Sequence, residues 1–491
     1  MTAATTATES PIAVLRNRRF LALWFAQVVT QVGGNMVLYG LTVQVFAVTG
    51  TSTSVSLLIL SYLVPAVLFG AVAGVYVDRQ DQRLILVATN ALRGVLFLAL
   101  LGVQNELALV YLLMIVISTL TTFFGPAEAA MIPVVVARRQ LLSANSLYIF
   151  TLQAAFFLGF ALLGPLVVNV AGQSVLLIVV AGSYLLGALV CWFLPSHNPR
   201  IGGHNPSQAL EEAGSAVATT FSQLADGLRF IREHKTIFWP LAYLALTASL
   251  IGVLGVLGPG FATQVLGLSE RDFVVVVLPI GVGLVMGILI LNVYGKHFTR
   301  RRGIEGGLIG LGVSLLALSI AQPLTTTLSL GPQISLLSLV IVVAFFAGIS
   351  YAFVAVPAQV QLQEELPEQI RGRVFGVLNM LVSIASFLPI IIVGPIADVV
   401  GTSLVVAASA IVALILAVGS IWRANPAHER PGPTGLIDAA DPVALAGRSL
   451  TQPIRIAHGG AGHEHEFGDE ALASAVIPGR PGPADSSEVA D

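Results

Sequence analysis

Charged side chains are scarce in this chain. Lysine, arginine, aspartate and glutamate make up 10% of its 491 residues, whereas a soluble domain carries about 25%. Hydrophobic residues make up 56%, and the mean hydropathy is +0.88. A soluble fold of this composition would lack the polar side chains needed to coat its surface. The composition therefore predicts an integral membrane protein.

Other absences narrow the function. Cys191 is the only cysteine, which excludes a disulfide framework and a metal centre built from cysteines. The sequence contains no GxxxxGK[ST] phosphate-binding loop and no recognisable nucleophile and base, so we expect no enzyme activity. A formal net charge of -2 argues against nucleic acid as a partner. The three histidines His458, His463 and His465 have no fixed scaffold around them, and we expect neither a metal nor a cofactor.

Long apolar runs recur along the chain, and each has about the 20 residues that a membrane helix needs. They lack the strict alternation of an outer-membrane barrel. The runs predict an all-α membrane protein with twelve transmembrane helices near residues 20–46, 53–77, 84–104, 107–132, 146–170, 174–194, 239–258, 273–294, 304–321, 334–357, 374–397 and 402–422.

The basic residues predict the orientation of these helices. If both termini lie in the cytoplasm, 22 of the 24 lysines and arginines fall in the cytoplasmic segments. The exceptions are Arg271, in an outer loop, and Arg93, inside a span. By the positive-inside rule, this distribution predicts a multi-pass protein of the cell (inner or plasma) membrane with both termini cytoplasmic.

The spans divide the chain into five segments. The longest loop, 195–238, lies between spans six and seven. Apolar residues at helical spacing in its second part, from Phe221 to Ile231, predict an amphipathic helix on the membrane surface. The tail is rich in proline, glycine and acidic residues, which is typical of disorder. The expected segments are a cytoplasmic N-terminal segment 1–19, a first six-helix half 20–194, a cytoplasmic linker 195–238, a second six-helix half 239–422, and a disordered cytoplasmic tail 423–491.

The two halves repeat each other's landmarks. Pro126-Ala127 in the fourth span matches Pro357-Ala358 in the tenth, 231 residues later. Gly164-Pro165 in the fifth span matches Gly394-Pro395 in the eleventh, with an offset of 230. Parallel six-helix repeats are typical of transporters in which the two halves rock around a central site.

Several segments resemble one transporter family. Residues 74–83, Gly-Val-Tyr-Val-Asp-Arg-Gln-Asp-Gln-Arg, resemble the loop between spans two and three of the major facilitator superfamily. Phe123 to Ala127, Gln363 to Pro367 and Arg371 to Phe375 are similar to its drug-efflux branch, which includes macrolide and siderophore exporters. The resemblance implies the major facilitator fold in a single monomeric chain, with a central cavity walled by spans one, four, seven and ten.

The loop after the second span is expected to gate this cavity, through Gly74, Asp78, Arg79 and Arg83. A carboxylate at a helix end can accept hydrogen bonds from the N-terminus of a neighbouring helix. The two arginines would then bridge to the other half and release when the halves rock. In the alternative interpretation, they are ordinary anchors at the membrane surface.

Polar side chains inside the spans predict a substrate cavity. Gln27, Gln31 and Asn35 are four residues apart and therefore share one face of the first span. Amides facing lipid would be unsatisfied, so this face lines a cavity or, alternatively, bonds neighbouring helices. Gln153, Asn379 and Ser383 are expected at the flank of the same cavity.

Arg93 and Glu128 are the ionisable residues expected deep in the first half. A buried guanidinium costs several kcal/mol unless it is paired, so the two are predicted to form a structural pair. In the alternative, Glu128 carries the proton that drives transport and Arg93 tunes it.

Together these observations predict a secondary transporter that exports a lipophilic or amphipathic small molecule by alternating access, with protons as one candidate for the coupling ion. A lipid flippase, or a facilitator not coupled to protons, is the main alternative. A membrane scaffold or sensor that does not transport is a more remote one. The expected partners are the small molecule, protons and the lipid bilayer.

Overall fold

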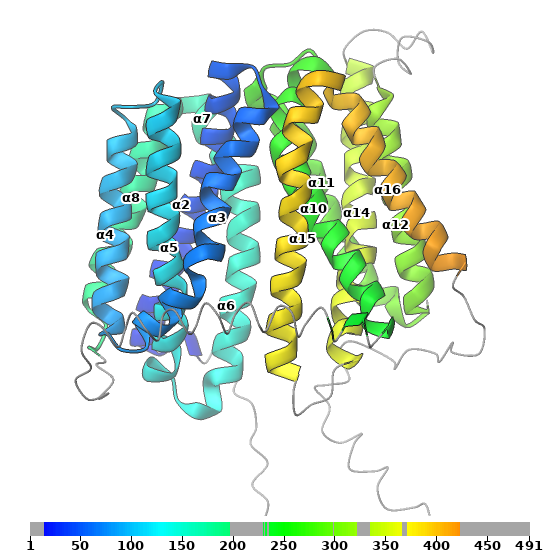
Figure 1. The fold of residues 1–491 in the computed structure, drawn as a ribbon. Coiled ribbons are helices and arrows are strands. Elements are labelled where there is room, and N and C mark those ends of the chain that lie inside the picture. The colour runs from blue at the N-terminus through cyan, green and yellow to red at the C-terminus, as the bar shows by residue number, and fades with distance from the viewer. Residues whose placement is uncertain are drawn as a thin grey trace, which may run out of the picture. The chain divides into compact units, whose positions relative to one another are not determined.

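The computed structural model describes residues 14–196, 229, 231–232, 235–297, 299–321, 334–365 and 371–422, all of which belong to one unit, Met1–Gly435. These residues form helices and their connecting turns, with no strand among them (Figure 1). Most of the predicted linker and all of the predicted tail lie outside the described residues, as does most of the N-terminal segment.

The first half consists of α2 to α8. Its first long helix, α2, begins after the N-cap residue Asn17. The Asn17 side chain accepts hydrogen bonds from the backbone N–H groups of Arg19 and Phe20, as expected for an asparagine at this position. The elements are α2 (Arg18–Thr49), α3 (Ser52–Val77), α4 (Gln82–Leu100), α5 (Leu107–Val135), η1 (Arg138–Gln140), α6 (Leu141–Phe156), η2 (Phe157–Leu163), α7 (Gly164–Ala171) and α8 (Gln173–Trp192).

The second half consists of α10 to α16. Glycines with positive φ, Gly267 and Gly401, stand in its connections, where a side chain would be strained. The elements are α10 (Lys235–Gln264), η3 (Glu270–Phe273), α11 (Val274–Tyr294), η4 (Gly295–His297), α12 (Arg300–Ser319), α14 (Ile334–Glu365), α15 (Arg371–Val400) and α16 (Thr402–Trp422).

The helices match the predicted spans. Among the described residues, 11 helices are long and apolar enough to cross a membrane. The remaining predicted span, 374–397, falls on α15, where Ile384–Val400 counts as a shorter apolar helix. The structure thus confirms an all-helical membrane protein. Of the twelve predicted crossings, the eleventh is supported by this shorter stretch alone.

The predicted repeat is visible in the way the helices pack. In the first half α3 packs on α5, α4 on α8, and α2 on η2. In the second half α11 packs on α14, α12 on α16, and α10 on α15. These pairs occupy equivalent positions in the two sequences of six helices, so both halves are built on one plan.

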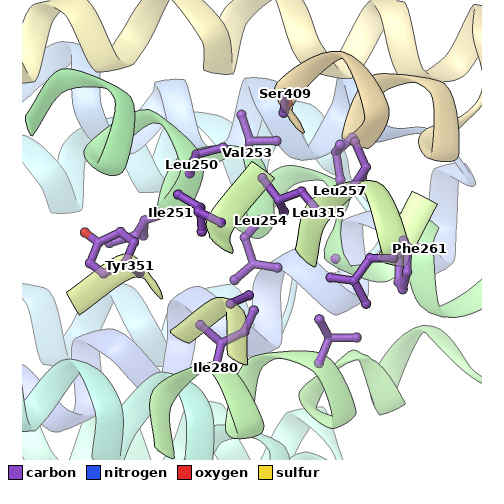
Figure 2. Close-up of a pocket in the computed structure, with 16 residues that line it drawn as sticks. Leu250, Ile251, Val253, Leu254, Leu257, Phe261, Ile280, Leu315, Tyr351 and Ser409 are labelled. Atoms are coloured by element: carbon purple, nitrogen blue, oxygen red, sulfur yellow. The ribbon is translucent and has the colours of Figure 1, made fainter. Parts of the chain in front are cut away.

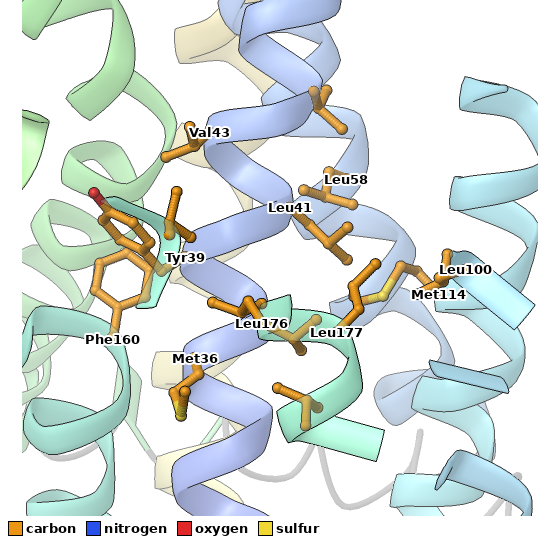
Figure 3. Close-up of a cluster of buried hydrophobic side chains, with 14 of the residues drawn as sticks. Met36, Tyr39, Leu41, Val43, Leu58, Leu100, Met114, Phe160, Leu176 and Leu177 are labelled. Carbon is orange, nitrogen blue, oxygen red and sulfur yellow. The ribbon is translucent and has the colours of Figure 1, made fainter. Parts of the chain in front are cut away.

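The first half has an apolar core between α2, α3, α5 and α8 (Figure 3). Leu41, Leu58, Leu176 and Met114 are almost completely buried in it. Tyr39 packs edge-on against Phe160 with ring centroids 5.7 Å apart. In a bilayer, lipid is as apolar as leucine, so close van der Waals packing is what holds these helices together.

The fifth span is not one regular helix. Pro165 has no N–H group, and the Gly164 N–H bonds five residues back to the Gly159 carbonyl, so η2 is a π-helix. Gly159 lies directly against α2, because a Cβ there would stand 2.5 Å from the Val32 carbonyl oxygen. Gly159, Gly164 and Pro165 thus lie where the span is irregular and where it approaches α2 closely.

Candidate functional site

The polar face of α2 divides between two environments. Gln27 is 1% exposed and donates to the Tyr148 carbonyl of α6 at 3.3 Å, so it bonds one helix to another. Gln31 and Asn35 line a cavity within the first half, and the Asn35 side-chain amide donates to the Gln31 carbonyl at 2.8 Å. The stripe predicted to face substrate therefore includes one helix–helix contact and two cavity-lining amides.

The cavity beside α2 is enclosed by five helices of the first half. Its volume is about 60 Å³. Arg93 of α4 lines it, together with polar residues from α2, α3, α5 and α8. These polar residues are Thr30, Gln31, Asn35, Tyr62, Thr121 and Tyr184.

Arg93 is 2% exposed and is held by neutral groups. Its guanidinium donates to the Thr89 carbonyl at 3.2 Å, the Thr121 hydroxyl at 3.3 Å and the Asn90 side-chain oxygen at 2.6 Å. The guanidinium carbon also lies 4.5 Å from the ring centroid of Phe124 and 4.7 Å from that of Tyr184. Such contacts stabilise a desolvated cation by about 2 kcal/mol or more.

Glu128 lies one helical turn beyond Phe124 on α5 and is 1% exposed. Neither of its carboxyl oxygens makes a hydrogen bond within the part of the chain that the structure describes. The Tyr148 hydroxyl reaches towards it from α6 outside ordinary hydrogen-bond geometry. Both Arg93 and Glu128 are described residues, and no ion pair joins them. The two residues are brought into the same half of the bundle without the salt bridge expected of them.

The predicted gating residues lie at the end of the bundle where α3 and α5 terminate, here named the basic end. Asp78 ends α3, and its N–H bonds to the Gly74 carbonyl at 3.1 Å. The guanidinium carbon of Arg83 lies 5.0 Å from the ring centroid of Trp192 on α8, within the same half. The bridges expected from Arg79 and Arg83 to the other half stay a prediction. The same holds for the roles of Gln153, Asn379 and Ser383, whose side chains are not described.

At the opposite end of the bundle, Asp398 of α15 caps α3 of the other half. Its carboxylate accepts from the Ser52 N–H at 2.7 Å, the Thr53 N–H at 2.9 Å and the Thr53 hydroxyl at 2.5 Å. The N-cap residue of α3, Thr51, makes no side-chain cap bond of its own. We call this contact the α3–α15 cap. Because it joins residues 345 positions apart, no local sequence pattern predicted this contact.

Two further contacts join the halves at this end. The Ser56 hydroxyl donates to the Ile390 carbonyl at 2.8 Å, and the Tyr39 hydroxyl donates to the Arg271 carbonyl. Tyr39 also stacks on Phe273 with ring centroids 4.8 Å apart. The halves are therefore in direct polar and aromatic contact at the end remote from the basic loops.

The second half encloses a cavity of a different kind (Figure 2). Its volume is about 100 Å³. Among the described residues that line it, only Tyr351 and Ser409 are polar, and the Ser409 hydroxyl is already bonded to the Val405 carbonyl at 3.0 Å. The lining is otherwise aliphatic and aromatic, and includes Leu250, Leu254, Leu257, Phe261, Ile280 and Leu315. No group of three or more potential metal ligands occurs among the described residues.

The family model described as the Major Facilitator Superfamily matches this chain over residues 23–389 and 281–461. The chain belongs to this superfamily. It is therefore a multi-pass membrane transporter and not an enzyme.

Curated relatives of this superfamily member include efflux proteins. The chain is 26% identical over 424 residues to the multidrug efflux pump Tap of Mycolicibacterium fortuitum, covering 82% of this chain and 95% of Tap. It is 22% identical over 391 residues to macrolide efflux protein A of Streptococcus pyogenes, covering 78% of this chain and 91% of that protein.

Solved structures of the same fold agree with the architecture. The nucleoside transporter NupG matches with a TM-score of 0.61 at 12% identity, over 83% of this chain and 99% of NupG. The POT family transporter PepTSo matches with a TM-score of 0.59 at 10% identity, over 83% of this chain and 97% of PepTSo. At such identity these matches establish the fold alone.

Proposed function

We propose that this superfamily transporter exports lipophilic or amphipathic small molecules by alternating access, in exchange for protons. The efflux activity named for Tap and for macrolide efflux protein A supports export. The cargo is proposed to be recognised mainly by shape and apolar contact, with a few hydrogen bonds, as in most small-molecule sites.

The orientation belongs to the same proposal. With the basic end in the cytoplasm, both termini are cytoplasmic, as the distribution of lysine and arginine favours. The α3–α15 cap and the contacts of Tyr39 with Arg271 and Phe273 then close the outer end. Breaking them would open the pathway outwards, while the loop with Asp78 closes the basic end.

Glu128 is the proposed proton carrier, and its unpaired carboxyl is the observation that carries the proposal. A buried carboxylate with no donor at either oxygen is costly, so the neutral acid fits the conformation described. Ionisation requires a rearrangement that brings water or the Arg93 guanidinium to the carboxyl group. Such a rearrangement would couple the loss of a proton to the movement of the halves.

The proposal is tested in proteoliposomes with a panel of fluorescent lipophilic dyes and an imposed pH gradient. We expect the wild type to move dyes against their concentration gradient and Glu128→Gln to lose this movement. Glu106→Gln is the matched control, since Glu106 is exposed at the N-cap position of α5 and its side chain makes no capping hydrogen bond. Gradient-driven transport by Glu128→Gln at the wild-type rate would overturn the role of Glu128.

The same vesicles separate export of small molecules from lipid transport. A fluorescent phospholipid is placed in one leaflet, and its accessibility to a membrane-impermeant quencher is followed. We expect no acceleration by the transporter. Lipid movement without dye movement would replace the proposed cargo with a lipid, and dye movement that ignores the gradient would indicate an uncoupled facilitator.

A further inference from the structure

Arg93 is a buried cation that makes no ion pair with any of the described residues. Its three described hydrogen bonds go to a backbone carbonyl, a hydroxyl and an amide oxygen. No carboxylate among the described residues makes an ion pair with it. The nearest acidic group on the facing helix, Glu128, lies a turn beyond the Phe124 ring that covers the guanidinium. Neutral dipoles lower the cost of burying this charge but do not cancel it.

The guanidinium retains hydrogen-bonding capacity. Arginine carries five N–H donors, and the described bonds use one on Nε, one on Nη1 and one on Nη2. The Arg93 side chain lines the cavity of about 60 Å³ together with Gln31 and the tyrosines Tyr62 and Tyr184. Amide and hydroxyl groups can all donate a hydrogen bond. A positive charge and several donors therefore surround one small enclosed space.

The size of this space limits its occupant. A single water needs about 10–15 Å³ of such volume, so the cavity holds a few waters or one compact ion. Water would hydrate the guanidinium but leave its charge uncompensated. An anion of halide size would accept from Arg93 and from the surrounding amide or hydroxyl groups, and it would also neutralise the cation.

We propose that the cavity between α2, α3, α4, α5 and α8 is a binding site for a compact monovalent inorganic anion, with Arg93 as its charged ligand. The anion is the counter-ion that no acidic side chain among the described residues provides through an ion pair. The proposal does not depend on the cargo or on the direction of transport. It gives Gln31 and Asn35 a role in an enclosed ion site in place of direct contact with the cargo.

The first test measures the thermal stability of the purified full-length transporter at constant ionic strength. Chloride or bromide replaces gluconate, which is too large for the cavity. We expect a saturable rise in melting temperature with either halide. Equal melting temperatures in halide and gluconate at all concentrations would overturn the proposal.

Two variants test whether the halide-dependent rise in melting temperature depends on Arg93. Arg93→Gln removes the charge, and Asn90→Asp supplies a carboxylate at the position that already accepts from Arg93 at 2.6 Å. We expect both to lose the halide-dependent shift, and Asn90→Asp to be at least as stable as the wild type in gluconate. Arg302→Gln, at an exposed position at the start of α12, is the matched control and should retain the shift. A halide shift that persists in Asn90→Asp would contradict the site, even if Arg93→Gln fails to fold.

Anomalous scattering from bromide provides an independent reading. We expect a bromide peak within hydrogen-bonding distance of the Arg93 guanidinium in crystals of the wild type, and none there in Asn90→Asp. Bromide confined to the protein surface would overturn the proposal.

Discussion

In the first half, the cavity of about 60 Å³ is lined by a guanidinium, two amides and several hydroxyls, whereas the larger cavity of the second half, about 100 Å³, is almost wholly apolar. Both cavities lie among helices that pack in the same pairs. The shared plan therefore fixes the backbone and leaves the chemistry of each interior free. The apolar lining offers water few hydrogen-bond partners, while the polar cavity needs water or an ion. We infer that ion handling is concentrated in the first half, and that the second half contributes apolar surface.

The largest effect is expected from placing a charge in the apolar cavity. Leu257 is 2% exposed. Leu257→Arg would bury a guanidinium against an almost wholly apolar lining that offers it few hydrogen-bond acceptors, at a cost of several kcal/mol. We expect the variant to be lost to aggregation, as judged by the monodisperse fraction in size-exclusion chromatography. Leu257→Met is the control and should remain monodisperse, because the two side chains have similar volumes. A well-folded Leu257→Arg would show that the two interiors do not differ as described.

A smaller effect is expected from removing the charge in the polar half. Arg93→Met retains much of the apolar stem but leaves the Asn90 oxygen and the Thr89 carbonyl without this donor. The loss of such bonds costs about 1–3 kcal/mol, which is partly offset because no charge remains buried. Chemical denaturation in detergent measures the free energy of unfolding. If Arg93→Met aggregates as Leu257→Arg is expected to, Arg93 is required for folding and is not primarily an ion ligand.

The smallest effect is expected where the two halves meet. Asp398→Asn retains an oxygen acceptor but loses the charge at the N-terminus of α3, and a helix cap contributes about 1 kcal/mol. We expect about a fivefold shift towards conformations open at this end. Double electron–electron resonance measures this opening as the distance between spin labels attached at Asn105→Cys and Ser269→Cys. Asp272→Asn is the control. An unchanged distance distribution in Asp398→Asn would remove the cap from the mechanism.

Much of the fold could be predicted from the sequence. Apolar runs of about 20 residues placed the spans, and the matched Pro-Ala and Gly-Pro pairs revealed the repeat. These features depend on local composition and on backbone chemistry, which the sequence states directly.

The site was less predictable, because it depends on how helices distant in sequence are aligned. The burial of Arg93 followed from its depth in a span, but its partners did not. Its side chain reaches back towards Thr89, and its guanidinium lies over the ring of Phe124, one helical turn before the acid expected to pair with it. The α3–α15 cap joins two helices by a side chain from the other half, which no local pattern signals.

The central claim is that Glu128 exchanges a proton as cargo binds. In weakly buffered detergent solution, adding a transported dye to the purified protein should release protons, detected with a pH indicator. The wild type and Glu106→Gln are expected to release them, and Glu128→Gln is expected to release none. Proton release by Glu128→Gln equal to that of the wild type would contradict the claim.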